Sequence, residues 1–150
     1  MTVLSRCLNL TLAATLLAGL SLPARAVDSY NPNGEAFIQA NLLLQDEDWP
    51  RAVSLLRTIV ADSPTSADAN NLLGYALRKS GDHVAAEGFY LRALELNPRH
   101  RGAHEYLGEL YVEIGRPEKA QELLLGLEQI CGNISCDEYR QLAEFIATKG

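Results

Sequence analysis

The sequence lacks the motifs that identify an enzyme or a nucleic-acid-binding protein. It contains no glycine-rich phosphate loop, no G-x-S-x-G nucleophile motif, no H-E-x-x-H metal motif and no EF-hand run. Basic residues are scarce as well, with 13 Lys and Arg against 19 Asp and Glu and a formal net charge of -6. That balance argues against a broad phosphate-neutralising face. We therefore predict no catalysis, no cofactor and no nucleic-acid partner.

Long hydrophobic runs are missing except at the N-terminus. Residues 7–22 are almost continuously apolar, Arg6 precedes them, and Pro23-Ala24-Arg25-Ala26 ends the run with small residues. This pattern is typical of a cleavable secretory signal over residues 1–26, followed by a short linker over 27–32. A retained transmembrane anchor is the alternative, but the run is short for a span of about 20 residues. The sequence predicts a periplasmic or secreted protein with no stable membrane span after cleavage.

Cysteine is rare, and only Cys131 and Cys136 follow the predicted signal. An even number of cysteines in an exported chain suits a disulfide, which across so short a loop would contribute roughly 2 kcal/mol. A redox-active pair is an alternative, although the spacing is not C-x-x-C. A metal site is another, and it would need further ligands such as His100 and His104. We favour the disulfide, predict no metal, and interpret His100 as a surface residue and His104 as a packed one.

What the sequence does contain is a repeat of 34 residues. Ala52, Ala86 and Ala120 are spaced by 34, and the pair Leu73-Gly74 recurs as Leu107-Gly108 at the same interval. Several residue types keep one spacing, so the chain is built from units of one size. The blocks are residues 33–66, 67–100 and 101–134.

Each block has the pattern of two helices joined by a turn. In the middle block, apolar residues recur with a helical period in two segments. Gly81 and Asp82 lie between these segments. Gly81 favours a helix end, and Asp82 suits the N-cap of the next helix. Small residues such as Gly74 let neighbouring helices approach closely. After Cys136, residues 137–149 form one more amphipathic segment. We predict that it is a closing helix that covers the open end of the core.

These motifs resemble the tetratricopeptide repeat (TPR) family over nearly all of the chain after the signal. The first block departs from the family pattern, with Gln39-Ala40 in place of Leu-Gly, and the third has Leu127 and Gly132 where Ala and Pro are expected. The resemblance implies an all-α fold, a right-handed α-solenoid of three TPR helix pairs with a C-terminal capping helix. The chain is similar to small exported bacterial TPR proteins. The residues that carry the resemblance in the middle block are Leu73, Gly74, Ala86, Tyr90, Ala93 and Pro98.

The resemblance also implies that the first helix of each pair lines a concave groove that binds a peptide or partner segment. Members of the family that bind chaperone tails grip a terminal carboxylate with basic side chains. Here the corresponding positions hold Phe37, Tyr75, Gly102 and Tyr106, and only Asn41 matches. The groove residues predicted on this basis are Phe37, Asn41, Leu44, Asn71, Tyr75, Arg78, Glu105, Glu109 and Val112.

The third block places acidic residues at inner positions, which favours a basic or neutral segment as the partner. We interpret the protein as a non-enzymatic interaction module or adaptor in the cell envelope that binds a protein or peptide partner. The alternative is an accessory or assembly factor for an envelope complex or for metalloprotein maturation, with a metal or redox role for the cysteine pair.

Overall fold

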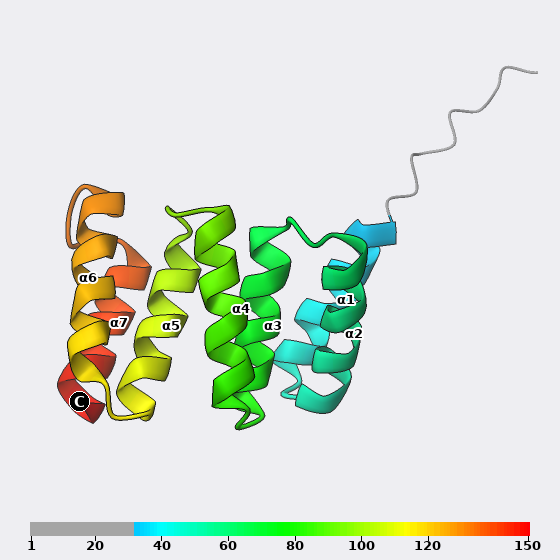
Figure 1. Ribbon diagram of the computed structural model, residues 1–150, viewed down its shortest axis with the longest axis horizontal. Helices are drawn as coiled ribbons and strands as arrows, with labels where there is room; N and C mark the ends of the chain where they lie inside the picture. The colour runs from blue at the N-terminus through cyan, green and yellow to red at the C-terminus, as the bar shows by residue number, and fades with distance from the viewer. Residues whose placement is uncertain (1–31) are drawn as a thin grey trace, which may run out of the picture. The chain divides into compact units, whose positions relative to one another are not determined.

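The computed structural model describes residues 32–150, and over that range the chain forms seven α-helices and no β-strand. The predicted signal peptide lies outside the described residues. The helices stand side by side in a row, with α1 and α2 at one end and α6 and α7 at the other (Figure 1). In chain order they are α1 (Pro32–Gln45), α2 (Trp49–Asp62), α3 (Ala67–Lys79), α4 (His83–Leu96), α5 (Arg101–Glu113), α6 (Pro117–Cys131) and α7 (Asp137–Lys149).

The turn inside each helix pair uses a left-handed residue at the same place in the repeat. Gly81 and Gly115 have φ of 87° and 72°, and Gly81 follows the end of α3 as the sequence predicts. Glu47 holds the equivalent position in the first pair with φ of 55° and is the one described residue other than glycine with a positive φ. A left-handed backbone at a residue with a side chain lowers stability by roughly 1 kcal/mol. The first turn therefore keeps the geometry of the other turns although Glu47 does not favour it.

Side-chain caps begin four of the helices. Asp48, Ser66, Asp82 and His100 each accept a hydrogen bond from the backbone N–H three residues later. The prediction of a surface His100 is wrong, since its side chain is only 12% exposed. The ring packs against the start of α5 because Nδ1 accepts a hydrogen bond from the Ala103 N–H at 3.1 Å. Each cap satisfies one of the free N–H groups at a helix start.

Small residues at the repeat period form the centre of the core. Ala52, Ala86 and Ala120 are all completely buried. A Cβ added to Gly74 would lie 2.8 Å from the ring of Tyr90, and one added to Gly108 would lie 2.6 Å from Leu142. These glycines allow large side chains to pack directly on the helix backbone. The all-α array of helix pairs with a closing helix that the sequence predicts is confirmed over residues 32–150.

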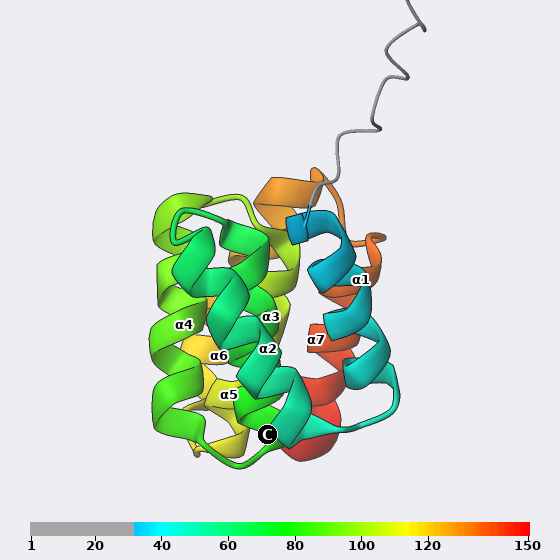
Figure 2. The same cartoon turned by 90° about the vertical axis from the view of Figure 1, so that its right-hand side faces the viewer.

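The last helix closes the array. Helix α7 packs against α5 and α6, and its Leu142 is fully buried, which contributes roughly 2 kcal/mol. A disulfide joins Cys131, at the end of α6, to Cys136, just before α7. In the end-on view α1 and α7 lie on one side of the array and α4 on the other, with α3 and α5 between them (Figure 2). No helix within residues 32–150 is long and apolar enough to cross a membrane.

Candidate binding groove

A groove runs between α1 and α3 and ends against α5. It consists of two adjoining pockets, which share Asn41 and Leu72. We call it the α1–α3 groove. Its lining residues are Phe37, Asn41, Leu44 and Gln45 from α1, Asp68, Asn71, Leu72 and Tyr75 from α3, and Tyr106 from α5.

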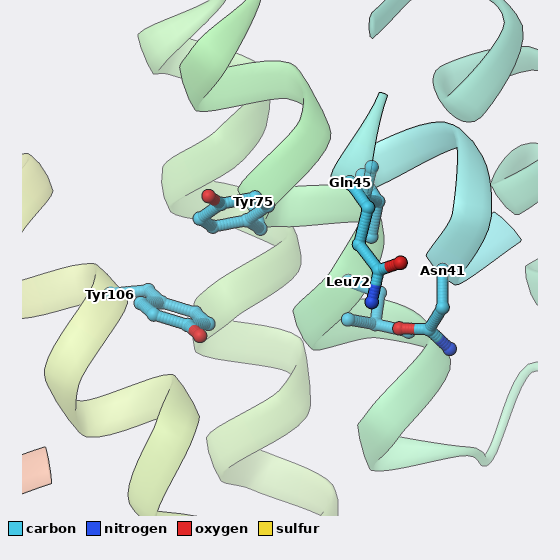
Figure 3. A pocket seen from close by; sticks show the side chains of 6 residues that line it. Asn41, Gln45, Leu72, Tyr75 and Tyr106 are labelled. Atoms are coloured by element: carbon cyan, nitrogen blue, oxygen red, sulfur yellow. The ribbon is translucent and has the colours of Figure 1, made fainter. Parts of the chain in front are cut away.

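The first pocket is lined mainly by rings and aliphatic side chains, and we call it the aromatic pocket. It has a volume of about 250 Å³, and its apolar lining consists of Leu44, Leu72, Tyr75 and Tyr106. The two tyrosine rings are tilted by 45° with centroids 4.9 Å apart, and Trp49 meets Tyr75 edge-on at 6.1 Å. Figure 3 shows the two rings across the pocket from Asn41, Gln45 and Leu72. Such a site suits one apolar side chain with polar groups at its rim.

The phenols of this pocket are neutral at pH 7, and burial raises their pKa further above that pH. It raises the pKa of Tyr106 to about 12, with Glu105 and Tyr75 as smaller contributors. It also raises the pKa of Tyr75, although the nearby Arg78 opposes the shift. At neutral pH both side chains therefore present rings and neutral hydroxyls to a ligand.

The second pocket is lined by two carboxamides, one carboxylate and two apolar side chains, and we call it the acceptor pocket after its oxygens. It has a volume of about 280 Å³, and Phe37, Asn41, Asp68, Asn71 and Leu72 line it. The Asn41 Nδ2 donates one of its two hydrogens to the Phe37 carbonyl at 2.8 Å, and the amide oxygen can accept a hydrogen bond from a ligand. Asn71 is 6% exposed, and its Oδ1 is buried with no hydrogen-bond partner. An unsatisfied buried oxygen is uncommon in folded proteins and marks a position where a donor would be stabilising.

The carboxylate of the acceptor pocket is positioned by a histidine. Because His100 Nδ1 accepts from a backbone N–H, its other nitrogen, Nε2, is the one that donates to Asp68 Oδ1, at 3.0 Å. The Asp68 side chain remains 81% exposed. Its second oxygen therefore stays accessible at the mouth of the pocket.

Arg78 was predicted to line the groove, but the structure places its guanidinium inside the protein. The side chain is 3% exposed and pairs with Glu109 and, at 3.2 Å, with Glu113. Arg78 belongs to α3 and both glutamates belong to α5, so the cluster joins one repeat to the next. Arg78 and Glu109 thus interact with each other in the structure.

Glu105 and Val112 are also buried, at 3% and 7% exposure. Both lie on α5, against which α7 packs, and the sequence pattern cannot show how closely a closing helix covers its neighbour. Burial, with repulsion from Glu109 and Glu138, raises the pKa of Glu105 to about 8. Of the nine predicted groove residues, Phe37, Asn41, Leu44, Asn71 and Tyr75 line the two pockets, and Arg78, Glu105, Glu109 and Val112 do not.

Four lining residues are absent from the predicted groove set. Leu72 is one of them, and Tyr106 is another, although it occupies a position that the carboxylate-binding members of the family use. Gln45 is one helical turn after Asn41, and Asp68 is about one turn before Asn71. That spacing could have found the last two, because residues three or four apart share a helix face.

The cysteine pair offers little to a metal ion. Within residues 32–150, Cys131, Cys136 and Glu138 form the one close group of metal-ligating residue types. The two sulfurs are bonded to each other and so do not present thiolates. Both ring nitrogens of His100 are already hydrogen-bonded, and His104 Nδ1 lies 3.1 Å from the His100 carbonyl oxygen.

Comparison with known proteins identifies the architecture. Two family models, both described as tetratricopeptide repeat, match residues 39–99 and 77–130. A TPR repeat-containing protein of Pseudomonas aeruginosa is 38% identical over 100 residues, which are 66% of this chain and 40% of that protein. The chain therefore spans less than half the length of this relative.

Several solved structures share the fold. The Sgt2 TPR domain from Aspergillus fumigatus has a TM-score of 0.71 and 18% identity, covering 79% of this chain and 78% of that one. The TPR2B domain of yeast Sti1, in its complex with pHsp70, has a TM-score of 0.69 and 20% identity, covering 79% and 98%. MamA from Desulfovibrio magneticus RS-1 has a TM-score of 0.64 and 22% identity, covering 68% and 58%.

Proposed function

The chain belongs to the tetratricopeptide repeat family, and from this premise we propose that it is a non-enzymatic interaction module that binds an extended segment of a partner protein in the α1–α3 groove. The observation that carries the proposal is the pair of adjoining pockets. One is bounded by Leu44, Tyr75 and Tyr106, and the other holds the unpartnered amide oxygen of Asn71. Apolar contact area next to unsatisfied polar groups is what a peptide, with its alternating side chains and amides, can complement.

The structural relatives support this proposal. The TPR domains of yeast Sti1 are seen in complexes with pHsp70 and pHSP90, and another similar chain is seen in the CopN–Scc3 complex. In this protein the five predicted residues that line the pockets all come from α1 and α3, the first helices of the first two repeats.

The chemistry of the groove favours binding over catalysis. Its polar groups are carboxamides, one exposed carboxylate and two tyrosine hydroxyls. The raised pKa values of Tyr75 and Tyr106 make both hydroxyls poor nucleophiles at neutral pH. Nucleophilic catalysis needs a nucleophile beside a base, and the lining residues offer no such pair.

We also propose that the protein is exported to the periplasm or secreted. The disulfide between Cys131 and Cys136 supports an oxidising compartment, because thiols stay reduced in the cytosol. The signal-like pattern over residues 1–26 supports the same location.

Site-specific photocrosslinking in native cells tests the binding function. A photoreactive amino acid replaces Gln45, an exposed residue at the rim of the groove, and in a matched strain replaces Glu118, an exposed residue of α6. We expect a discrete crosslinked partner from position 45 and none from position 118. The product at 45 should disappear when Asn71→Ala and Tyr75→Ala are combined in the same chain. Equal products at both positions, or a product that survives the double substitution, would refute the groove as the binding site.

A further inference from the structure

We propose that the α1–α3 groove selects an extended segment with a basic and an apolar side chain two residues apart. The basic side chain occupies the acceptor pocket, and the apolar side chain occupies the aromatic pocket. The inference rests on the proposed function and adds to it the chemistry of the partner.

The acceptor pocket matches a cationic side chain. The acceptors available to a ligand include the Asn41 amide oxygen and the largely exposed Asp68 carboxylate. Asn71 adds a carboxamide whose Oδ1 lacks a hydrogen-bond partner. Lys and Arg carry donors and no acceptors, so they can bond these oxygens, and the Asp68 carboxylate adds an opposite charge. The Phe37 ring in the same pocket can add a cation–π contact.

An acidic side chain would find no cationic partner in this pocket. The one arginine of α3 and the one arginine of α5 already have carboxylate partners. Arg78 pairs with Glu109 and Glu113, and Arg101 lies 3.4 Å from Glu138. No cation within residues 32–150 lines either pocket. A ligand carboxylate would therefore lose its water shell without gaining a donor of opposite charge.

The aromatic pocket matches one aliphatic side chain. Tyr75 and Tyr106 form one wall and Leu72 lies across from them, with Leu44 also in the lining. The volume of about 250 Å³ is enough for a leucine-sized or methionine-sized group. Gln45 can bond the backbone of the segment as both donor and acceptor, and the Asn41 oxygen can accept from it.

The distance between the pockets sets the spacing of the two side chains. Along α1 the lining residues advance from Phe37 to Asn41 to Gln45, and along α3 they advance from Asp68 to Leu72 to Tyr75. Each step is about four residues, or about 6 Å along a helix axis. Side chains two residues apart on one side of an extended chain are about 6.6 Å apart. An extended segment that runs along the groove can therefore place one side chain in the first pocket and the side chain two residues later in the second.

Blocked synthetic peptides of about nine residues in a Gly/Ser background test the inference on the full chain. The set contains Lys-Ser-Leu, its reverse Leu-Ser-Lys, the charge reversal Glu-Ser-Leu, the neutral Gln-Ser-Leu, and Lys-Ser-Ser-Ser-Leu with the spacing of a helix. Binding is followed by fluorescence of Trp49, the sole tryptophan, whose ring contacts Tyr75. We expect one of the two Lys–Leu orders to bind at least about tenfold more tightly than Glu-Ser-Leu and more tightly than the helix-spaced peptide.

Substitutions assign each arm of the peptide to its pocket. Asp68→Asn should weaken the Lys peptide about threefold to fivefold, as expected for an exposed ion pair, and leave Gln-Ser-Leu unchanged. Tyr75→Ala should weaken both peptides about tenfold. Glu118→Gln makes the same change of charge on the exposed surface of α6 and should change neither. Circular dichroism confirms that each variant retains its helix content.

The outcomes separate this inference from the proposed function. Binding that requires Tyr75 but favours Glu, Gln or the helical spacing overturns the inference and leaves the groove as the site. Failure of every peptide to bind also overturns the inference, while the crosslinking at Gln45 still decides the proposed function. Peptide binding that is unchanged by Tyr75→Ala contradicts both.

Discussion

Replacing Glu105 with glutamine tests whether one buried carboxyl sets the pH dependence of stability. Glu105 is 3% exposed. Burial is the largest cause that raises its pKa from 4.5 to about 8, repulsion from Glu109, Glu138 and Asp137 adds to the shift, and Arg78 opposes it. Between these two pKa values the folded protein holds a proton that the unfolded chain has released.

The sign and size of the effect follow from proton linkage. Because the unfolded state binds fewer protons between pH 4.5 and 8, the free energy of unfolding falls as the pH rises, by up to about 1.4 kcal/mol per unit. The stabilisation from a protonated Glu105 is complete below pH 4.5 and is lost as the pH approaches 8. By pH 7 the loss amounts to about 3 kcal/mol.

Urea unfolding at several pH values from 5 to 9 measures this slope. Glutamine cannot ionise, so the Glu105→Gln protein should gain stability relative to wild type by about 3 kcal/mol between pH 5 and 8 and no further above that. The substitution can also change the free energy of unfolding by the same amount at every pH. The test therefore compares the slopes of the two curves against pH. Glu118→Gln, at an exposed position of α6, should follow the wild-type curve. Parallel curves for Glu105→Gln and wild type would refute the assignment of a buried, protonated carboxyl.

Two further predictions concern packing and the closing helix, and urea midpoints measure both. Gly74→Ala should destabilise by about 1–3 kcal/mol because its methyl group would lie 2.8 Å from the Tyr90 ring, whereas Gly88→Ala, with nothing within 4 Å, should stabilise by about 0.5–1 kcal/mol. Equal effects at the two glycines would argue against close helix packing at Gly74. Replacing Cys131 and Cys136 with serine should lower the free energy of unfolding by about 2 kcal/mol. No loss would show that packing alone holds α7.

The helical array could be predicted from the sequence because its signals are local and repeated. A small residue recurs at Ala40, Gly74 and Gly108, each 34 residues from the next, and all three lie in buried parts of their helices. Ala40 is completely buried although the first repeat lacks the Leu-Gly pair. The period therefore locates the close-packing position even where the family motif changes.

Contacts made across repeats could not be predicted in the same way. Periodicity indicates which face of a helix a residue shares, but it does not indicate which distant side chain covers that face. Arg78 was assigned to the groove, although Glu109 and Glu113 hold it inside. Glu105 was assigned there too and is buried on α5, against which α7 packs. Glu47 gave no sign of its left-handed backbone, because that conformation is imposed by the helices on either side.

The two sides of the groove are held by different kinds of contact, and this difference bears on how it would bind. Helices α3 and α5 are joined by the ion pairs of Arg78 and by the contact between the Tyr75 and Tyr106 rings, whose planes are tilted by 45°, so the tyrosine wall is fixed before a ligand arrives. Helix α1 packs mainly on α2 and supplies the opposite wall. Since a preorganised site loses less entropy on binding, the tyrosine wall favours affinity. Asn41 and Asp68, at the acceptor pocket, favour the choice of side chain, because a mismatched ligand would displace water from their oxygens without supplying a donor.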